Sequence, residues 1–108
     1  MLVTTSEFVA GHAITEHLGL AKGNTIRARH VGRDIIALLR TLVGGEIQEY
    51  TKLMAEAREQ ALDRMITSAT AMGADAVIDV RFSTSVVLGG AAELLAYGTA
   101  VKLSADTP

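Results

Sequence analysis

The sequence predicts an α+β domain in which one long helix lies across an antiparallel sheet as a two-layer sandwich. Residues 46–72 repeat apolar side chains at spacings of three and four, which is typical of a helix with one buried face. Residues 75–88 and 92–103 alternate apolar and polar side chains around Gly89-Gly90, which is typical of two strands joined by a turn. A helix and a sheet that each have an apolar face bury those faces against each other.

The composition of the chain indicates a single domain over residues 1–108 that completes its core by self-association. The chain is 108 residues long, and domains usually hold about 100–150 residues around one core. Hydrophobic residues make up 49% of the sequence, charged residues only 20%, and the mean hydropathy is +0.31. A chain this short buries only about two-thirds of the surface that it exposes when unfolded. We therefore expect further copies of the chain to cover the excess apolar surface.

Composition also excludes several classes of function. Cysteine is absent, which rules out disulfides, thiolate metal sites and thiol nucleophiles. The net charge is −2 and four residues are aromatic, so neither a basic field nor a stacking platform favours nucleic acid as a partner. The N-terminus lacks the pattern of a signal peptide, and no apolar stretch reaches the roughly 20 residues of a membrane span. We therefore expect a cytoplasmic protein with no membrane partner.

The first part of the chain predicts short strands. Residues 1–5 favour a small edge strand, which could pair with a neighbouring chain. Residues 14–21 and 25–28 are predicted as two strands of a hairpin, because Gly23-Asn24 between them is a favourable two-residue turn.

The next segment, residues 31–43, is predicted as a short helix that Gly44-Gly45 ends. Its apolar residues occupy more than one side, so we expect neighbouring subunits to cover it. The main stripe consists of Ile35, Leu38, Leu39 and Leu42.

The last two predicted strands carry apolar residues that the long helix alone cannot cover. In the first strand, simple alternation places Ala76, Ile78, Val80, Phe82 and Val86 on one face. The second strand is apolar on both faces, so a second subunit is expected on the face away from the helix. Those two faces hold Leu95, Tyr97, Val101 and Leu103 on one side, and Leu94, Ala96, Gly98 and Ala100 on the other.

Several short motifs occur in the order and spacing of a known family. They are Gly11 with Ile14 and Gly19, Arg33-Asp34, Val43-Gly44-Gly45, Tyr50, Glu56-Ala57-Arg58-Glu59, residues 72–77, Arg81 and Gly98-Thr99-Ala100-Val101. Together they resemble the YbjQ-like family of small bacterial proteins, which carries a provisional heavy-metal-binding label and no established function. The resemblance implies a dodecin-like, ring-forming subunit, typically in a homopentamer.

Four residues make up a candidate metal site: His12, Glu16, His17 and His30. Neutral imidazole and carboxylate groups suit a divalent first-row metal such as zinc. Neighbouring residues of a strand point to opposite faces, so one chain offers at most two well-placed ligands, and a ring could bring copies together. The alternative is that these are polar surface residues of an edge strand.

A basic segment is the candidate anion site, with Arg27, Arg29, Arg33 and Arg40 opposed only by Asp34. Guanidinium groups bind phosphates and carboxylates, and here they could also line the central channel of a ring. Alternatively, Arg33 pairs with Asp34 or with an acidic residue of the long helix, and the other arginines are solvated.

No catalytic constellation is visible, so we expect the protein not to be an enzyme. Asp75 is interpreted as a turn residue, and Asp79 and Arg81 as a pair on one face of a strand. Two functions remain open. One is a homo-oligomeric protein that binds a divalent metal ion or small anion at subunit boundaries. The other is a structural or protein-interaction module without a small-molecule ligand.

Overall fold

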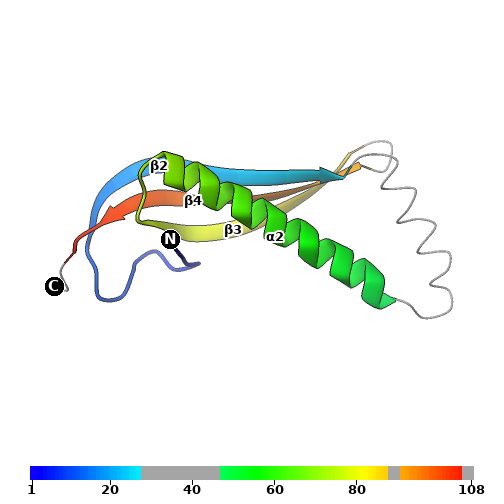
Figure 1. The fold of residues 1–108 in the computed structure, drawn as a ribbon, viewed down its shortest axis with the longest axis horizontal. Helices are drawn as coiled ribbons and strands as arrows, with labels where there is room; N and C mark the ends of the chain where they lie inside the picture. The colour runs from blue at the N-terminus through cyan, green and yellow to red at the C-terminus, as the bar shows by residue number, and fades with distance from the viewer. Residues whose placement is uncertain (28–46, 88–90, 106–108) are drawn as a thin grey trace.

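In the part of the chain that the computed structural model describes, one helix packs on one face of a four-stranded sheet, which confirms the predicted two-layer α+β architecture (Figure 1). The structure describes residues 1–27, 47–87 and 91–105, so the helix predicted over residues 31–43 lies outside the described residues. The elements are β1 (Leu2–Val3), β2 (Ile14–Arg27), α2 (Ile47–Ala71), β3 (Ala76–Val87) and β4 (Ala91–Leu103). Among the described residues, no helix is long and apolar enough to cross a membrane.

The sheet has the strand order β1-β3-β4-β2 and is mixed rather than wholly antiparallel. The three long strands pair antiparallel, and the short β1 adds a parallel partner to β3. The predicted N-terminal strand is therefore present, but it pairs within its own chain. Its backbone is held there by hydrogen bonds from Leu2 N to Asp75 O at 3.5 Å and from Thr4 N to Val77 O at 3.0 Å.

The predicted hairpin around Gly23-Asn24 is wrong, because β2 is one strand of 14 residues. Gly23 pairs with Ala96 and Asn24 with Leu95, so the chain passes straight through the expected turn. Gly23 has a different role. A Cβ atom at this position would overlap the backbone of α2 at Ala61 and Met65. Glycine is thus required here by the close approach of a helix.

Helix α2 covers β2 and β4 with a stripe of small side chains, as its apolar spacing predicts. Ala57, Ala61, Met65 and Ala69 are each at most 1% exposed. Gly73, with φ of 82°, follows the helix in the left-handed conformation that commonly ends helices. The buried core between the two layers consists of Ala21, Ala61, Met65, Ala69, Val77, Val80, Ala96 and Ala100.

A bulge at Asp79 changes which side chains of β3 lie on the helix side of the sheet. Asp79 has a positive φ of 54°, and the pairing with β4 shifts between Ile78 and Arg81. As a result Ile78 packs on the outer face of the sheet, whereas Val80 packs under the helix. The predicted single face through Ile78, Val80 and Phe82 is therefore wrong, because one extra residue reverses the alternation.

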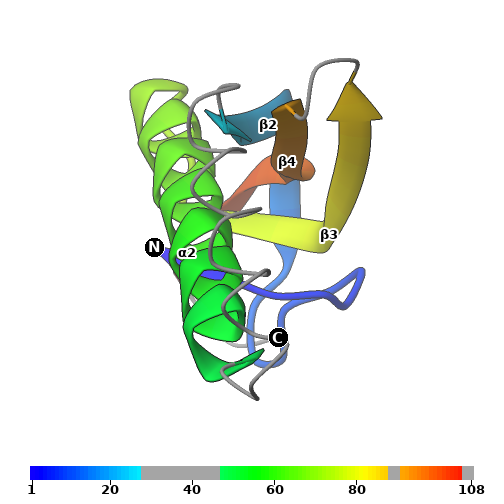
Figure 2. The ribbon, with the colours of Figure 1, turned by 90° about the vertical axis from the view of Figure 1, so that its right-hand side faces the viewer.

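The N-terminal segment covers one end of the sheet face that lies away from α2 (Figure 2). Val9 packs there against Ala76, Ile78 and Val101, and Ile14 and Leu103 border the cluster. The chain itself thus provides part of the cover that we expected from a second subunit.

Candidate functional site

His12 lies in the loop before β2 and is held by the end of β4. Its Nδ1 atom is 3.0 Å from the carbonyl oxygen of Ser104, and Ala13 N donates to Ser104 Oγ at 3.0 Å. A carbonyl oxygen only accepts hydrogen bonds, so Nδ1 carries a proton, and in the neutral imidazole the lone pair is then on Nε2. The His12 ring is also exposed to solvent, so Nε2 is suited to bind a metal ion.

Glu16 and His17 are exposed on β2 but lie on opposite faces of the sheet. They pair with Lys102 and Val101, and the register of β2 against β4 shifts both before and after this pair of residues. Because successive side chains of a strand alternate, His17 shares the outer face with Val101, and Glu16 lies on the helix side. His30 lies outside the described residues.

The described part of the chain therefore does not assemble the predicted metal site. Within residues 1–27, 47–87 and 91–105, no group of three or more histidines and carboxylates is close enough to hold a metal ion. Any metal site that uses His12 or His17 needs ligands from beyond this set.

The predicted anion site falls largely outside the described residues. Arg27 closes β2, but its side chain is not described, and Arg29, Arg33 and Arg40 lie in the segment 28–46. In the described part, Arg81 Nη1 donates to Thr5 O at 2.9 Å and to Val80 O at 2.8 Å, rather than pairing with Asp79 as predicted. These bonds give Arg81 a structural role.

Asp75 also serves the backbone. Its Oδ2 atom accepts a hydrogen bond from Leu103 N at 2.9 Å and ties the start of β3 to the end of β4. This bond joins two strands, whereas the sequence predicted a local role for Asp75 in the helix-to-strand turn.

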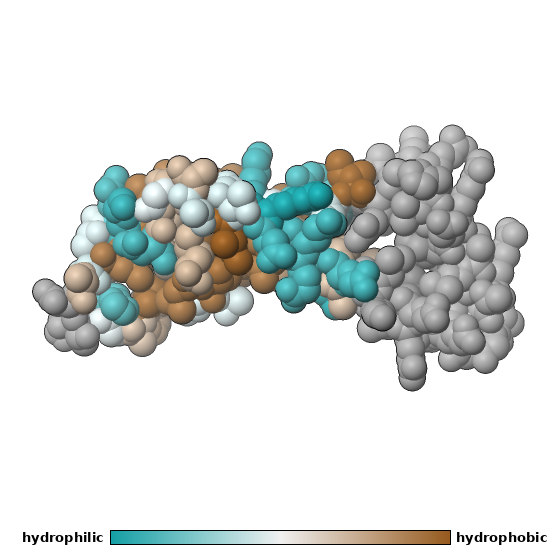
Figure 3. All heavy atoms as spheres, in the orientation of Figure 1, coloured by the Kyte–Doolittle hydropathy of each residue, from teal (hydrophilic) through white to brown (hydrophobic). Residues whose placement is uncertain are grey.

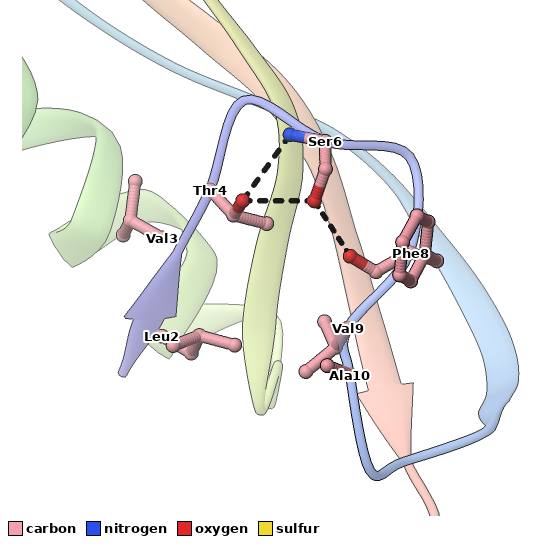
Figure 4. A pocket seen from close by; sticks show the side chains of 7 residues that line it. All are labelled: Leu2, Val3, Thr4, Ser6, Phe8, Val9 and Ala10. Carbon is pink, nitrogen blue, oxygen red and sulfur yellow. Dashed lines mark hydrogen bonds between the residues drawn. The ribbon is translucent and has the colours of Figure 1, made fainter.

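The N-terminal loop lines an open cavity of about 470 Å³ that the sequence did not reveal (Figure 4). Its polar groups satisfy one another: the hydroxyl oxygens of Thr4 and Ser6 are 2.9 Å apart, and Ser6 Oγ donates to Phe8 O at 2.7 Å. The cavity is thus mainly apolar and offers no charged ligand. Its lining consists of Leu2, Val3, Thr4, Ser6, Phe8, Val9 and Ala10.

Three hydrogen bonds clasp this loop to the bulge of β3. Asp79 N donates to Ser6 O at 3.0 Å, and Val80 N donates to Thr4 O at 3.1 Å. The third bond is the one from Arg81 to Thr5 described above. Alternation of apolar residues carries no signal for this clasp, because the clasp depends on the bulge.

Large apolar side chains remain exposed on the sheet. Leu20 is 60% exposed and Ile26 is 62% exposed, both on β2, and Phe82 on β3 is 47% exposed. Figure 3 shows apolar surface beside the polar residues of the described part of the molecule. Single exposed apolar residues are common on protein surfaces, so these three do not by themselves mark an interface.

Comparison with known proteins identifies the relatives of this chain. Residues 1–104 match the family model of YbjQ, which is described as "Putative heavy-metal-binding". A UPF0145 protein of Methanosarcina acetivorans is 56% identical over 103 residues, covering 95% of this chain and 97% of the relative. A UPF0145 protein of Dehalococcoides mccartyi strain BAV1 is 59% identical over 101 residues, covering 94% and 97%. The relatives include archaeal proteins, so the expected restriction to bacteria is too narrow.

A solved structure supports the fold. The crystal structure of a protein of unknown function from Pediococcus pentosaceus, assigned to the DUF74 family, has a TM-score of 0.57 and 18% identity. The match covers 96% of this chain and 98% of the other. At this identity the likeness concerns the fold alone.

Proposed function

Because the chain belongs to the YbjQ family, we propose that it is a homo-oligomeric protein that binds a divalent metal ion or a small anion where subunits meet. A pentamer is the expected assembly. The observation that carries the metal proposal is His12, an exposed imidazole whose Nδ1 atom is fixed by Ser104 O and whose Nε2 atom holds the lone pair of the neutral ring.

Self-association would complete the ligand set that the described part of one chain lacks. His12 and His17 are both exposed near the start of β2, yet the described part of one chain does not complete a ligand set around them. A second copy could provide the remaining ligands, as metal sites with two imidazoles commonly need three or four donors. In such an assembly a neighbouring copy would cover the exposed side chains of Leu20 and Ile26.

A second candidate is a structural or protein-interaction module with no small-molecule ligand. It is favoured by the lack of a preassembled metal-binding group in the described part of the chain. Catalysis is not proposed for either candidate, since Asp75 and Arg81 are engaged with backbone groups.

The metal proposal is tested by zinc titration of untagged protein, followed by calorimetry, with the mass measured in parallel by light scattering. We expect binding by an assembly several times the subunit mass of 11.4 kDa. The double variant His12→Ala, His17→Ala should lose at least tenfold in affinity. Binding should also weaken below about pH 6.5, where free histidine side chains take up a proton.

A matched control is Glu56→Ala, Asp63→Ala, which removes two exposed carboxylates of α2 instead. It should bind zinc like the wild type. Equal binding by the histidine variant and the wild type would exclude these histidines. If the wild type and both variants assemble but none of them binds zinc, the interaction module is favoured.

A further inference from the structure

The outer edge of β3 is covered over only half of its length by the described chain. Strand β1 pairs with Ala76 and Val77, and the N-terminal loop accepts the N–H groups of Asp79 and Val80. Beyond Val80, no strand of the described part lies along this edge. In Figure 2, the second half of β3 lies along the edge of the sheet that is farther from α2. With respect to residues 1–27, 47–87 and 91–105, the second half of β3 therefore presents an open strand edge.

The hydrogen bonds show which backbone groups of this edge point outward. Val80 N donates to Thr4 O, so the backbone of Val80 faces away from β4. Facing alternates along a strand, so the N–H and C=O groups of Phe82, Thr84 and Val86 also point outward. Each of these residues offers one donor and one acceptor to a strand placed alongside.

The far side of the sheet leads to the same assignment. Arg64 Nη1 donates to Asn24 O at 2.6 Å, so the backbone of Asn24 faces away from β4. Its partner Leu95 must then turn its own backbone groups toward β3, where it pairs with Ser83. Ser83 thus faces β4, and its neighbours along the strand face outward.

The sequence of this edge is close to a palindrome. Phe82-Ser83-Thr84-Ser85-Val86 reads as apolar, Ser, Thr, Ser, apolar in both directions. When two such strands run antiparallel about Thr84, Thr84 faces Thr84, Ser83 faces Ser85, and Phe82 faces Val86. Hydroxyl pairs across the seam stabilise neighbouring strands. In this register the outward N–H and C=O groups of all three outward residues find partners.

The two edges of the sheet differ in how they are guarded. On β2, Arg64 occupies a carbonyl of the edge, and Glu16 and Lys22 add charges, which are devices that discourage strand addition. Residues 82–86 carry no charge, and Ser83, Thr84 and Ser85 are all exposed. The edge of β3 is therefore the one suited to pairing.

We propose that two copies of this chain pair antiparallel along residues 82–86 of β3, about a two-fold axis at Thr84, so that one sheet continues across both subunits. The pairing itself does not depend on the proposed ring. Its place in a larger assembly rests on the proposed function: a five-fold ring contains no two-fold axis of this kind, so the contact would join two rings.

The register is tested by two double variants that alter the same exposed residues. Ser83→Lys, Ser85→Lys places lysine opposite lysine twice, whereas Ser83→Lys, Ser85→Glu places lysine opposite glutamate twice. These are non-hydrogen-bonded positions, where facing Cα atoms are about 4.5 Å apart, so the signs of the charges matter most. By light scattering, the Lys/Glu variant should keep the mass of the wild type, and the Lys/Lys variant should have half of it. High salt should reduce the difference.

Other outcomes separate the pairing from the ring. If the wild type has two subunits and the Lys/Lys variant has one, each of 11.4 kDa, the pairing stands and the ring fails. If the wild type has five subunits and neither variant changes its mass, the ring stands and the pairing is overturned. Equal masses for the two double variants, whatever their value, also overturn the pairing. Circular dichroism checks that both variants are folded.

Discussion

Gly23 lies where α2 crosses β2, and its missing Cβ is what allows the two elements to approach. The space that a Cβ would fill is already occupied by the backbone of Ala61 and Met65. Backbone atoms cannot move aside as the end of a flexible side chain can. The residue type at this position is therefore set by packing rather than by a turn.

Replacing Gly23 with alanine should lower the free energy of unfolding by roughly 3 kcal/mol, at the upper end of overpacking costs. Urea unfolding followed by circular dichroism measures this change. Gly11→Ala is the control, because a Cβ there meets nothing within 4 Å, although Gly11 has φ of 83°. It should cost about 1–2 kcal/mol, which is the strain of a left-handed alanine. A smaller loss for Gly23→Ala than for Gly11→Ala would contradict the packing role.

Asp79 has the left-handed conformation that the bulge requires, with φ of 54°. Asp and Asn adopt this conformation more readily than other non-glycine residues, and β-branched residues adopt it least. Asp79→Val should therefore lower stability by about 1–2 kcal/mol and loosen the N-terminal clasp, whereas Asp79→Asn should change little. Hydrogen exchange at the N–H groups of Asp79 and Val80 measures the clasp. Unchanged exchange in the valine variant would show that the clasp does not depend on this conformation.

At the scale of elements, α2 could be predicted closely and β2 could not. The spacing of Ala57, Ala61, Met65 and Ala69 is a local pattern, and the predicted bounds of residues 46–72 differ from Ile47–Ala71 by one residue at each end. The course of β2 depends on the helix that crosses it at Gly23, which is contact between distant segments. The bulge of β3 was missed for a related reason: alternation assumes that no residue is inserted.

The same elements predict how α2 responds to enlargement of its buried stripe. Ala61 is fully buried over β2, so Ala61→Leu should separate the layers and lower the unfolding free energy by roughly 3 kcal/mol. The neighbouring Gln60→Leu, at an exposed position, should change it by no more than about 0.5 kcal/mol. Thermal unfolding of both variants gives the comparison. Similar melting temperatures would mean that the contact between the layers is looser than described.

At the scale of the molecule, the sheet is long and its cover is uneven. The 14 residues of β2 span about 46 Å at roughly 3.3 Å per residue. Helix α2 covers one face, and the N-terminal segment covers one end of the other.

The sequence indicated the surplus of apolar surface through its composition, and the exposed Leu20, Ile26 and Phe82 agree with it. The composition could not assign these residues to faces, because the Asp79 bulge and the straight β2 decide that. Self-association stays a prediction, and so do the metal residues His12 and His17.

The hydrogen bond from Arg64 to Asn24 O, together with the charges of Glu16 and Lys22, discourages strand addition at β2 and leaves the edge of β3 as the one suited to pairing. A sheet with two unguarded edges could grow without limit into a fibril, whereas one unguarded edge ends growth at a pair. Arg64→Ala should therefore promote fibrils that bind thioflavin T, with a lag that shortens as protein concentration rises. Arg58→Ala, which removes another exposed arginine of α2, should stay soluble. Equal fibril formation by the two variants would show that β2 is protected by something other than this arginine. If only Arg64→Ala forms fibrils, one side chain on a helix decides whether strand addition to this sheet stops at a pair or continues into a polymer.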